Sequence, residues 1–443
     1  MRAINACTSR FKNLFLATNN VDNLMMITFA KRFVLAAIAV AGMALACQVP
    51  STHTDDRLQL SLAFVDQQLD DAVSQIKVLA RHVPADRMPR TFEGDTSVSS
   101  NTGWWTSGFY PGSLLYLYEY SGDDELLALA KDKLAILEKE KYNKGTHDLG
   151  FMLYCSFGNA LRLTGDTAAY KEILLTGAES LISRYNPTVK AIRSWQGWTF
   201  PVIIDNMMNL EFLTQASQLS GDSKYRDIAV THANTTMANH YRPDYSSYHV
   251  IDYNPEDGSI VGKKTAQGAF DESAWARGQA WGLYGYVMMY RETGDGAYLD
   301  FAKHLASFML NHPNMPEDGV PYWDFDAPDL PAESPYVADY TANRDASAAA
   351  VMASALIELS TFTEGEESET YLGAAERVLE SLSAAPYKAA AGTNGGFILA
   401  YSVGSIPHGT EIDVPLTYAD YYYIEALMRY RRLLEGKPLG GRA

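Results

Sequence analysis

Short turns centred on glycine recur along this chain, and each one separates two apolar runs with helical spacing. Glycine adopts the left-handed backbone conformation that ends a helix, and an Asp or Ser just after it can cap the next helix. Because such turns join antiparallel helices, the pattern predicts a series of helical hairpins. The turns are Ser121-Gly122-Asp123, Thr164-Gly165-Asp166, Ser220-Gly221-Asp222, Thr293-Gly294-Asp295 and, less regular, Glu364-Gly365-Glu366.

The spacing of apolar residues predicts where the helices lie. A first helix is expected over residues 57–80, and a last helix over 420–434 would pack beside it. The β-propensity of the chain is low, apart from possible short strands near 248–253 and 397–401. The pairs expected between the first and last helices are 114–120 with 126–137, 149–163 with 170–181, 207–219 with 223–239, 279–292 with 296–311, and 346–361 with 368–383.

A cluster of aromatic, Asp, His or Arg residues precedes one helix of each pair and the last helix. If those helices surround a common axis, all the clusters open onto one face and can build one pocket. The chain is therefore predicted to be all-α, with an (α/α)6 barrel. An open helical solenoid is the alternative, but the chain has no fixed short repeat and its aromatic-rich loops are irregular. The clusters are Trp104–Tyr110, His147–Phe151, Asp205–Asn209, Trp275–Trp281, Arg344–Ser347 and Tyr418–Tyr421.

Residues 1–46 have the features of an export leader. Lys31 and Arg32 precede a short apolar stretch, and the segment 44–46 fits a small-residue cleavage site. Cleavage after Ala46 would leave Cys47 as a possible lipid anchor, and an ordinary secretory cut fits almost as well. We therefore expect an exported protein, either periplasmic or an outer-membrane lipoprotein. A tether at 47–56, a catalytic barrel at 57–435 and a tail at 436–443 would follow.

The acidic charge and the few cysteines limit the possible partners. The formal net charge is −17, and removal of the leader would make the chain still more acidic. Such a surface repels polyanions, which argues against nucleic acid as a partner. Of three cysteines only Cys155 falls inside the expected barrel, so no disulfide framework is expected. The nine His residues show neither HxxxH nor HxH spacing, and we expect no metal and no cofactor.

Asp148 and Asp205 are the candidate catalytic residues, because each begins a helix and both should project at the same mouth. An Asp at a helix start is often only a cap, which is the structural alternative. Here His147 precedes Asp148, and Asn206 and Asn209 follow Asp205, so each Asp belongs to a polar cluster within apolar sequence. In a desolvated pair of carboxylates one group stays ionised and the other keeps its proton, as general acid catalysis requires.

Arg277 and Trp281 lie four residues apart on one face of a helix. The small neighbours of Arg277 suggest an accessible guanidinium that can hold a carboxylate, and a structural ion pair with an Asp is an equal alternative. His249 and Gln267, in the preceding loop, can complete a polar wall. Tryptophans near the clusters can stack on sugars, although about half of them should be core packing. They are Trp104, Trp105, Trp195, Trp198, Trp275 and Trp281.

Three strings carry a resemblance to a known family: His147-Asp148-Leu149-Gly150-Phe151, Asp205-Asn206-Met207-Met208-Asn209 and Ala276-Arg277-Gly278-Gln279-Ala280-Trp281-Gly282-Leu283. They resemble the unsaturated glucuronyl hydrolases of glycoside hydrolase family 88, and the resemblance extends from about residue 57 to 435. It implies an (α/α)6 barrel that removes the Δ4,5-unsaturated uronic acid that polysaccharide lyases leave on oligosaccharides. The implied partner is therefore a small anionic glycan.

The resemblance also implies roles for single residues. Asp205 would be the general acid and base, and Asp148 would assist it. Two departures from the family pattern are Ala419, where a Gly is expected, and the lack of a clear Ser-x-x-Ser-x-Lys string, which some members use for sulfated sugars. With His147, which stands next to Asp148, the expected substrate-binding residues are His249, Gln267, Arg277, Trp281, Trp104 and Trp105.

The implied chemistry is a hydration, unlike ordinary glycoside hydrolysis. Asp205 would protonate C4 of the vinyl ether and then help water add at C5, and the hemiketal would open and release the glycan without a covalent sugar–enzyme intermediate. An unsaturated rhamnogalacturonyl hydrolase would use the same chemistry on a different sugar. A sugar epimerase on a similar barrel would use paired His bases. A non-catalytic glycan-binding lipoprotein would leave Asp148 and Asp205 without a role.

Overall fold

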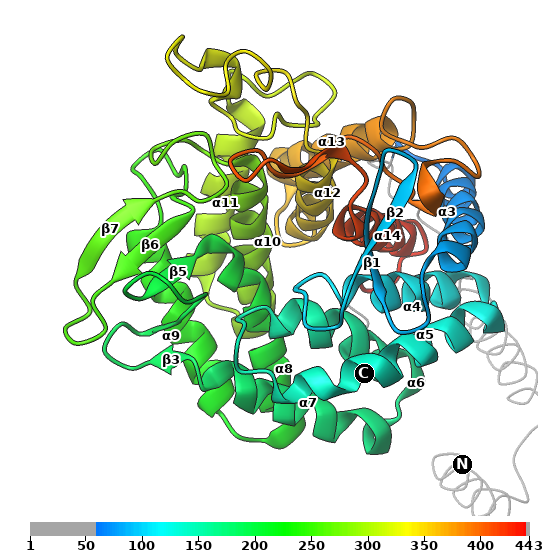
Figure 1. The fold of residues 1–443 in the computed structure, drawn as a ribbon, viewed down its shortest axis with the longest axis horizontal. Coiled ribbons are helices and arrows are strands. Elements are labelled where there is room, and N and C mark those ends of the chain that lie inside the picture. The colour runs from blue at the N-terminus through cyan, green and yellow to red at the C-terminus, as the bar shows by residue number, and fades with distance from the viewer. Residues whose placement is uncertain (1–58, 440–443) are drawn as a thin grey trace, which may run out of the picture. The chain divides into compact units, whose positions relative to one another are not determined.

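The computed structural model describes residues 59–439 and places two rings of helices around one axis (Figure 1). The predicted leader at 1–46, the tether at 47–56 with Cys47, and residues 440–443 of the tail lie outside the described residues. Within 59–439, no helix is both long and apolar enough to cross a membrane.

The inner ring is closed, because each inner helix packs against the next around the axis and α14 returns to α4. This closure confirms the (α/α)6 barrel and excludes the open solenoid. The inner ring comprises α4 (Phe109–Ser121), the π-helix Gly150–Gly158 with α6 (Asn159–Thr164), α8 (Leu210–Ser220), α10 (Ala276–Thr293), α12 (Ala346–Ser360) and α14 (Thr417–Leu434). The outer ring comprises α3 (Leu62–His82), α5 (Asp124–Leu137), α7 (Thr167–Ile182), α9 (Lys224–Asn239), α11 (Gly296–Asn311) and α13 (Gly365–Leu382).

The turns from inner to outer helices follow the predicted pattern in four of the five cases. Gly122, Gly165, Gly221 and Gly294 are all left-handed and each ends an inner helix. The prediction for Glu364-Gly365-Glu366 was wrong. Helix α12 already ends at Ser360, and Gly365 is the first residue of α13, so residues 361–364 form a looser connection.

All strands lie in the long connections that lead from outer helices into inner helices, at the mouth of the barrel. The expected strand near 248–253 is present as β6, but the one near 397–401 starts later, at Ser402, because Tyr401 has a positive φ of 57°. All pairings are antiparallel, and Ile203 of β5 faces Val250 of β6. The strands are β1 (Met88–Glu93), β2 (Thr96–Ser100), β3 (Tyr185–Asn186), β4 (Ala191–Ile192), β5 (Pro201–Ile203), β6 (Val250–Tyr253), β7 (Ile260–Lys264), β8 (Ser402–Ser405) and β9 (Thr410–Val414).

Two glycines allow the starts of neighbouring inner helices to touch. A Cβ atom on Gly108 would lie 2.1 Å from the carbonyl oxygen of Phe151, and one on Gly150 would lie 2.7 Å from the Cα of Asn209. Any larger residue would push these segments apart. The close approach therefore brings the segment after Asp148 next to the segment that contains Asp205.

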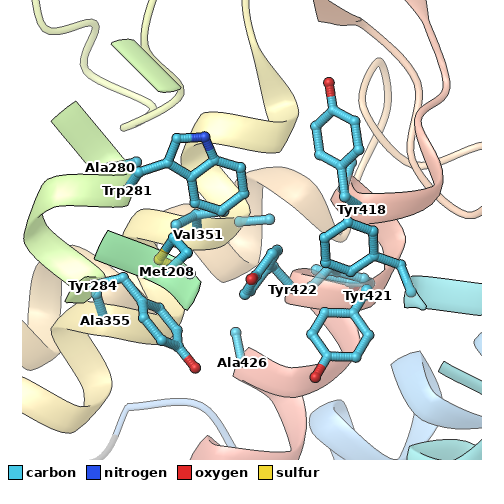
Figure 2. Packing of buried hydrophobic residues seen from close by; sticks show 14 of the residues in the cluster. Met208, Ala280, Trp281, Tyr284, Val351, Ala355, Tyr418, Tyr421, Tyr422 and Ala426 are labelled. Atoms are coloured by element: carbon cyan, nitrogen blue, oxygen red, sulfur yellow. The ribbon is translucent and has the colours of Figure 1, made fainter. Parts of the chain in front are cut away.

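Aromatic side chains of the inner helices fill the barrel below the mouth. Figure 2 shows Trp281 of α10 facing Tyr418 and Tyr422 of α14, with Val351 of α12 near Trp281. The ring centroids of Trp281 and Tyr422 are 5.4 Å apart in an edge-to-face arrangement. This packing is typical of aromatic pairs in protein cores and gives the mouth a rigid floor.

Candidate active site

Asp205 lies in a short 3₁₀ segment, Ile204–Asn209, that leads directly into α8. Strand β5 ends just before it, and the amide of Ile204 donates a hydrogen bond of 3.1 Å to the carbonyl of His249. The pairing of β5 with β6 therefore places Asp205 beside His249. Residues 204–209 are buried, so the polar groups of this segment face a desolvated environment.

Burial raises the pKa of Asp205 to about 7. The residue is 8% exposed, and its Oδ2 atom has no partner within hydrogen-bond distance. The carboxylate of Asp148 raises the pKa further, whereas the guanidinium of Arg277 and the indole N–H of Trp281 lower it. Desolvation is the largest effect, and it favours the protonated form of Asp205.

His249 presents an N–H group to Asp205. Its Nδ1 atom accepts from the amides of Ala266 and Gln267, at 3.1 and 3.2 Å, so the hydrogen of the neutral ring is on Nε2. Nε2 lies 3.7 Å from Oδ2 of Asp205. Burial, together with the charge of Arg277, holds the pKa of His249 well below its usual value. His249 is thus a neutral donor toward Asp205 and no second base.

His147 and Asp148 form a second titratable pair. Nδ1 of His147 lies 2.9 Å from the carbonyl oxygen of Ser194 and must donate to it. The other ring nitrogen, Nε2, lies 3.2 Å from Oδ1 of Asp148. Nε2 has no hydrogen-bond partner within the described residues. Burial lowers the pKa of His147, and the charge of Asp148 opposes that effect.

Asp148 does not act as a helix cap. Its Oδ2 atom accepts from the hydroxyl of Thr146 at 2.7 Å, and its other oxygen faces His147. The carboxylate therefore remains available at the mouth and is close enough to Asp205 to raise the pKa of that residue. The structural alternative of two simple N-caps does not describe either aspartate.

The prediction of an accessible Arg277 was wrong. The residue is 1% exposed, and its Nη1 atom lies 3.1 Å from Oδ2 of Asp345, which caps α12. The same guanidinium also donates to the carbonyls of Val403 and Gly404 on β8. The structural ion pair, which was the alternative, is therefore present. The reason is that β8 folds over the guanidinium, a long-range contact that the neighbours in sequence do not indicate. Nε of Arg277 has no hydrogen-bond partner in the described residues.

Gln267 and Trp281 lie on the walls of the same site. The side-chain amide of Gln267 donates to the carbonyl of Gly404 at 3.1 Å, and its backbone amide donates to His249. Trp281 is fully buried below the carboxylates, and its ring lies 5.2 Å from the ring of Phe151. The structure thus brings His249, Gln267 and Trp281 together around Asp205.

Trp104 and Trp105 have different surroundings. Trp105 packs against Tyr418, with ring centroids 4.9 Å apart, and against Phe109 and Phe151 in the floor of the site. Trp104 is 39% exposed, and the guanidinium of Arg90 lies 4.3 Å above its ring. Of the two, Trp104 offers an open face at the rim.

Trp195 is a further aromatic residue of the site that the predicted set of binding residues omits. Its ring stands edge-on to the rings of both histidines, with centroid distances of 6.5 Å to His147 and 6.2 Å to His249. Trp195 therefore packs between the two histidines. Its position after a short strand gives no sign of this contact. The signal in the sequence was only its place among the tryptophans near Asp205.

A cavity of about 350 Å³, lined by both polar and apolar residues, lies lower on the barrel axis. It is lined by Gly150 and Met208 at one end and by Arg432 and Leu439 at the other, and neither Asp148 nor Asp205 borders it. Burial raises the pKa of Glu211, on its wall, to about 7. This cavity is therefore separate from the site around the two aspartates.

Comparisons with known proteins agree with this geometry. The family model described as Glycosyl Hydrolase Family 88 matches residues 80–292. An unsaturated glucuronyl hydrolase of Formosa agariphila is 47% identical over 334 residues, which cover 74% of this chain and 80% of that protein. This chain belongs to glycosyl hydrolase family 88.

Solved structures of family 88 proteins have the same fold. A crystal structure of an unsaturated glucuronyl hydrolase specific for heparin is 46% identical, with a TM-score of 0.79, and covers 86% of this chain and 100% of its own. A mutant of the Streptococcus agalactiae enzyme complexed with dGlcA-GalNAc6S is 29% identical, with a TM-score of 0.71, over 87% of this chain and 96% of its own. Family 88 membership makes the protein a glycosidase, as predicted, and disfavours the non-catalytic lipoprotein.

Proposed function

We propose that this family 88 glycosidase removes a terminal Δ4,5-unsaturated uronic acid from lyase-generated oligosaccharides by hydrating the C4=C5 bond. The observation that supports this chemistry best is the raised pKa of Asp205, to about 7, beside a second carboxylate. A proton-bearing carboxylic acid is what protonation of a vinyl ether carbon requires.

In the first step Asp205 transfers its proton to C4 of the unsaturated sugar. The electron pair of the double bond forms the new C4–H bond, and positive charge develops at C5 and the ring oxygen. The ionised Asp205 then lies close to this charge and stabilises it. Nε2–H of His249 faces this carboxylate, with Nε2 3.7 Å from Oδ2, which is beyond a direct hydrogen bond.

In the second step water adds to C5, and Asp205 takes the proton that the water releases. Asp205 therefore ends the cycle in the protonated form in which it began. The product is a hemiketal at C5. Its ring opens by breaking the C5–O5 bond, which gives a ketone at C5 and a hemiacetal at C1. That hemiacetal collapses to an aldehyde, and the bond from C1 to the glycan oxygen breaks. The carboxylate of Asp148, close to the reacting carbons, helps to keep the pKa of Asp205 high.

The substrate class that we propose is a small anionic fragment of glycosaminoglycan type. Support comes from relatives that are named for unsaturated chondroitin disaccharides and from the similar structure of a heparin-specific enzyme. We also propose that the protein is exported, on the strength of the leader at 1–46. A lipid on Cys47 is the more specific form of that proposal.

The proposal is tested by following the ultraviolet absorbance of the conjugated C4=C5 bond when the protein meets an unsaturated disaccharide. The absorbance should fall with the wild-type protein. Asp205→Asn should lose at least ~10³ of the rate, because it removes the general acid but keeps the size of the side chain. Asp420→Asn is a matched control, since Asp420 is also buried with a pKa raised to about 7 but accepts from the backbone amides of Ile398 and Leu399. Near-normal turnover by Asp205→Asn would remove Asp205 from this role.

A further inference from the structure

A second hollow opens on the mouth face beside the site. It has a volume of about 580 Å³ and runs between the turn after β1 and strand β9. Its walls combine apolar, carboxylate and aromatic side chains, a mixture that suits sugars because their ring faces are apolar and their edges are polar. The lining includes Phe92, Glu93, Tyr401, Glu411, Asp413 and Pro415.

Tyr401 is displayed in this groove by a strained backbone. Its φ angle is 57°, which a bulky residue rarely adopts, and 43% of the residue is exposed. Its carbonyl accepts from the amide of Ala346, the first residue of α12, and this hydrogen bond helps to fix the backbone conformation of Tyr401. Strain of this kind persists where the surroundings enforce it and is concentrated at ligand sites. The chain thus holds an exposed aromatic ring in a fixed place.

The β8–β9 hairpin links the groove to the active site, because it contributes residues to the groove and contacts Gln267. The carbonyl of Gly404, three residues after Tyr401 and roughly 10 Å along an extended chain, accepts from Arg277 and Gln267. A Cβ atom on Gly404 would lie 2.6 Å from the Cβ of Glu411, so Glu411 covers the other side of the same strand.

Glu411 also links the groove to the open tryptophan at the rim. Its Oε1 atom lies 2.7 Å from Nη2 of Arg90, whose guanidinium stacks on Trp104. Trp104 and Tyr401 therefore flank one strip of surface, with the Arg90–Glu411 ion pair between them.

The charges of the groove favour a particular kind of sugar. Glu93, Glu411 and Asp413 all line it, and of these Glu411 is ion-paired with Arg90. Carboxylates accept hydrogen bonds from sugar hydroxyls but repel sulfate groups. The ring bound on Tyr401 should therefore carry no anionic substituent.

We propose that this groove binds the part of the oligosaccharide that continues beyond the leaving sugar, with Tyr401 as the platform on which an uncharged ring stacks. The inference rests on the proposed function, because it requires the unsaturated terminus to sit near Asp205. It predicts that the enzyme prefers an unsaturated tetrasaccharide over the disaccharide of the same polymer.

The test compares kcat/KM for an unsaturated tetrasaccharide whose sugars beyond the terminal uronic acid are all uncharged, dGlcA-Glc-Rha-Glc, and for the disaccharide dGlcA-Glc. The tetrasaccharide should be about three- to tenfold better with the wild type, the range expected of one aromatic contact. Tyr401→Ala and Tyr401→Gly should bring the ratio to about one, and Tyr401→Phe should keep it. Tyr142→Ala is the control, because Tyr142 is an exposed tyrosine that lines a different hollow together with residues of α7. Its removal should change neither the ratio of the two kcat/KM values nor the activity on the disaccharide.

The results separate the two proposals. Cleavage of neither substrate by the folded wild type would contradict the proposed function. Cleavage of both substrates with a ratio near one would overturn the proposed role of the groove but not the proposed function. A ratio that Tyr401→Ala leaves unchanged would have the same meaning. Loss of the ratio in Tyr401→Ala but not in Tyr401→Gly would also overturn it. Glycine adopts positive φ without strain, and such a result would assign the effect to the backbone of β8 instead of the ring.

Discussion

Asp205 has a raised pKa because the 3₁₀ segment that carries it is buried and Oδ2 lacks a hydrogen-bond partner, whereas an exposed aspartate titrates near 3.9. The neighbouring histidines do not compete for its proton. His249 is held neutral, and its N–H faces Asp205. Nδ1 of His147 donates to the carbonyl of Ser194, and Nε2 of His147 faces Asp148. At the scale of single residues, the site therefore contains one acid that is poised near neutral pH.

This assignment fixes the pH dependence of the reaction. The active form carries a proton on Asp205, so kcat/KM should be flat below about pH 7 and fall tenfold per pH unit above it. The direction follows from the raised pKa, because raising the pH removes the catalytic proton. The measurement is kcat/KM on an unsaturated disaccharide between pH 5 and 9. A fall that starts near pH 4 would show that an ordinary exposed carboxylate, and not Asp205, supplies the proton.

At the scale of elements, the loops that lead into inner helices are tied together by buried polar contacts. Arg277 at the start of α10 bonds to Asp345 at the start of α12 and to two carbonyls of β8. These contacts set the position of the β8–β9 hairpin over the site. The other end of the inner helices, next to the short turns, carries ion pairs of its own, among them Arg162–Glu119 and Arg291–Glu358.

Arg277→Ala should destabilise the fold by about 3–5 kcal/mol, because it leaves the buried carboxylate of Asp345 without its partner. Asp345→Ala should lower the free energy of unfolding by a similar amount. The double variant should lower it by less than the sum of the two single losses. Urea unfolding of the wild type, the two single variants and the double variant at pH 7 measures this coupling. A loss below about 1 kcal/mol for Arg277→Ala would show that the ion pair is not structural. A raised KM in a stable variant would restore a direct role in holding the substrate carboxylate.

The close approach at Gly108 gives a second prediction at this scale. Gly108→Ala should destabilise the barrel by several kcal/mol and lower activity, since the new Cβ would lie 2.1 Å from the carbonyl oxygen of Phe151 and would push away the π-helix that follows Asp148. Gly296→Ala is the matched control. Gly296 begins α11 with open space around it, so alanine there should be neutral or slightly stabilising. Thermal unfolding and turnover of both variants provide the check, and equal effects would contradict the packing argument.

At the scale of the whole molecule, the sequence was sufficient to predict the barrel, because the turns at Gly122, Gly165, Gly221 and Gly294 and the apolar periodicity are local signals. It also indicated which end carries the chemistry, and it selected Asp148, Asp205, His249 and Gln267, which the structure places together. The burial of Arg277 and the contact of Trp195 with two histidines could not be predicted. Both depend on strands and loops that are distant in sequence. The packing of these segments produces no periodic pattern in the sequence.

The most direct test of the central claim is to run the reaction in D₂O and examine the released uronic acid by NMR. If Asp205 protonates the vinyl ether, the C4=C5 chromophore disappears and one solvent deuteron is found at C4 of the product. Asp205→Asn should give neither change at a measurable rate. Release of the neighbouring sugar with the chromophore intact and no deuterium at C4 would mean direct cleavage of the glycosidic bond, and that result would contradict the account.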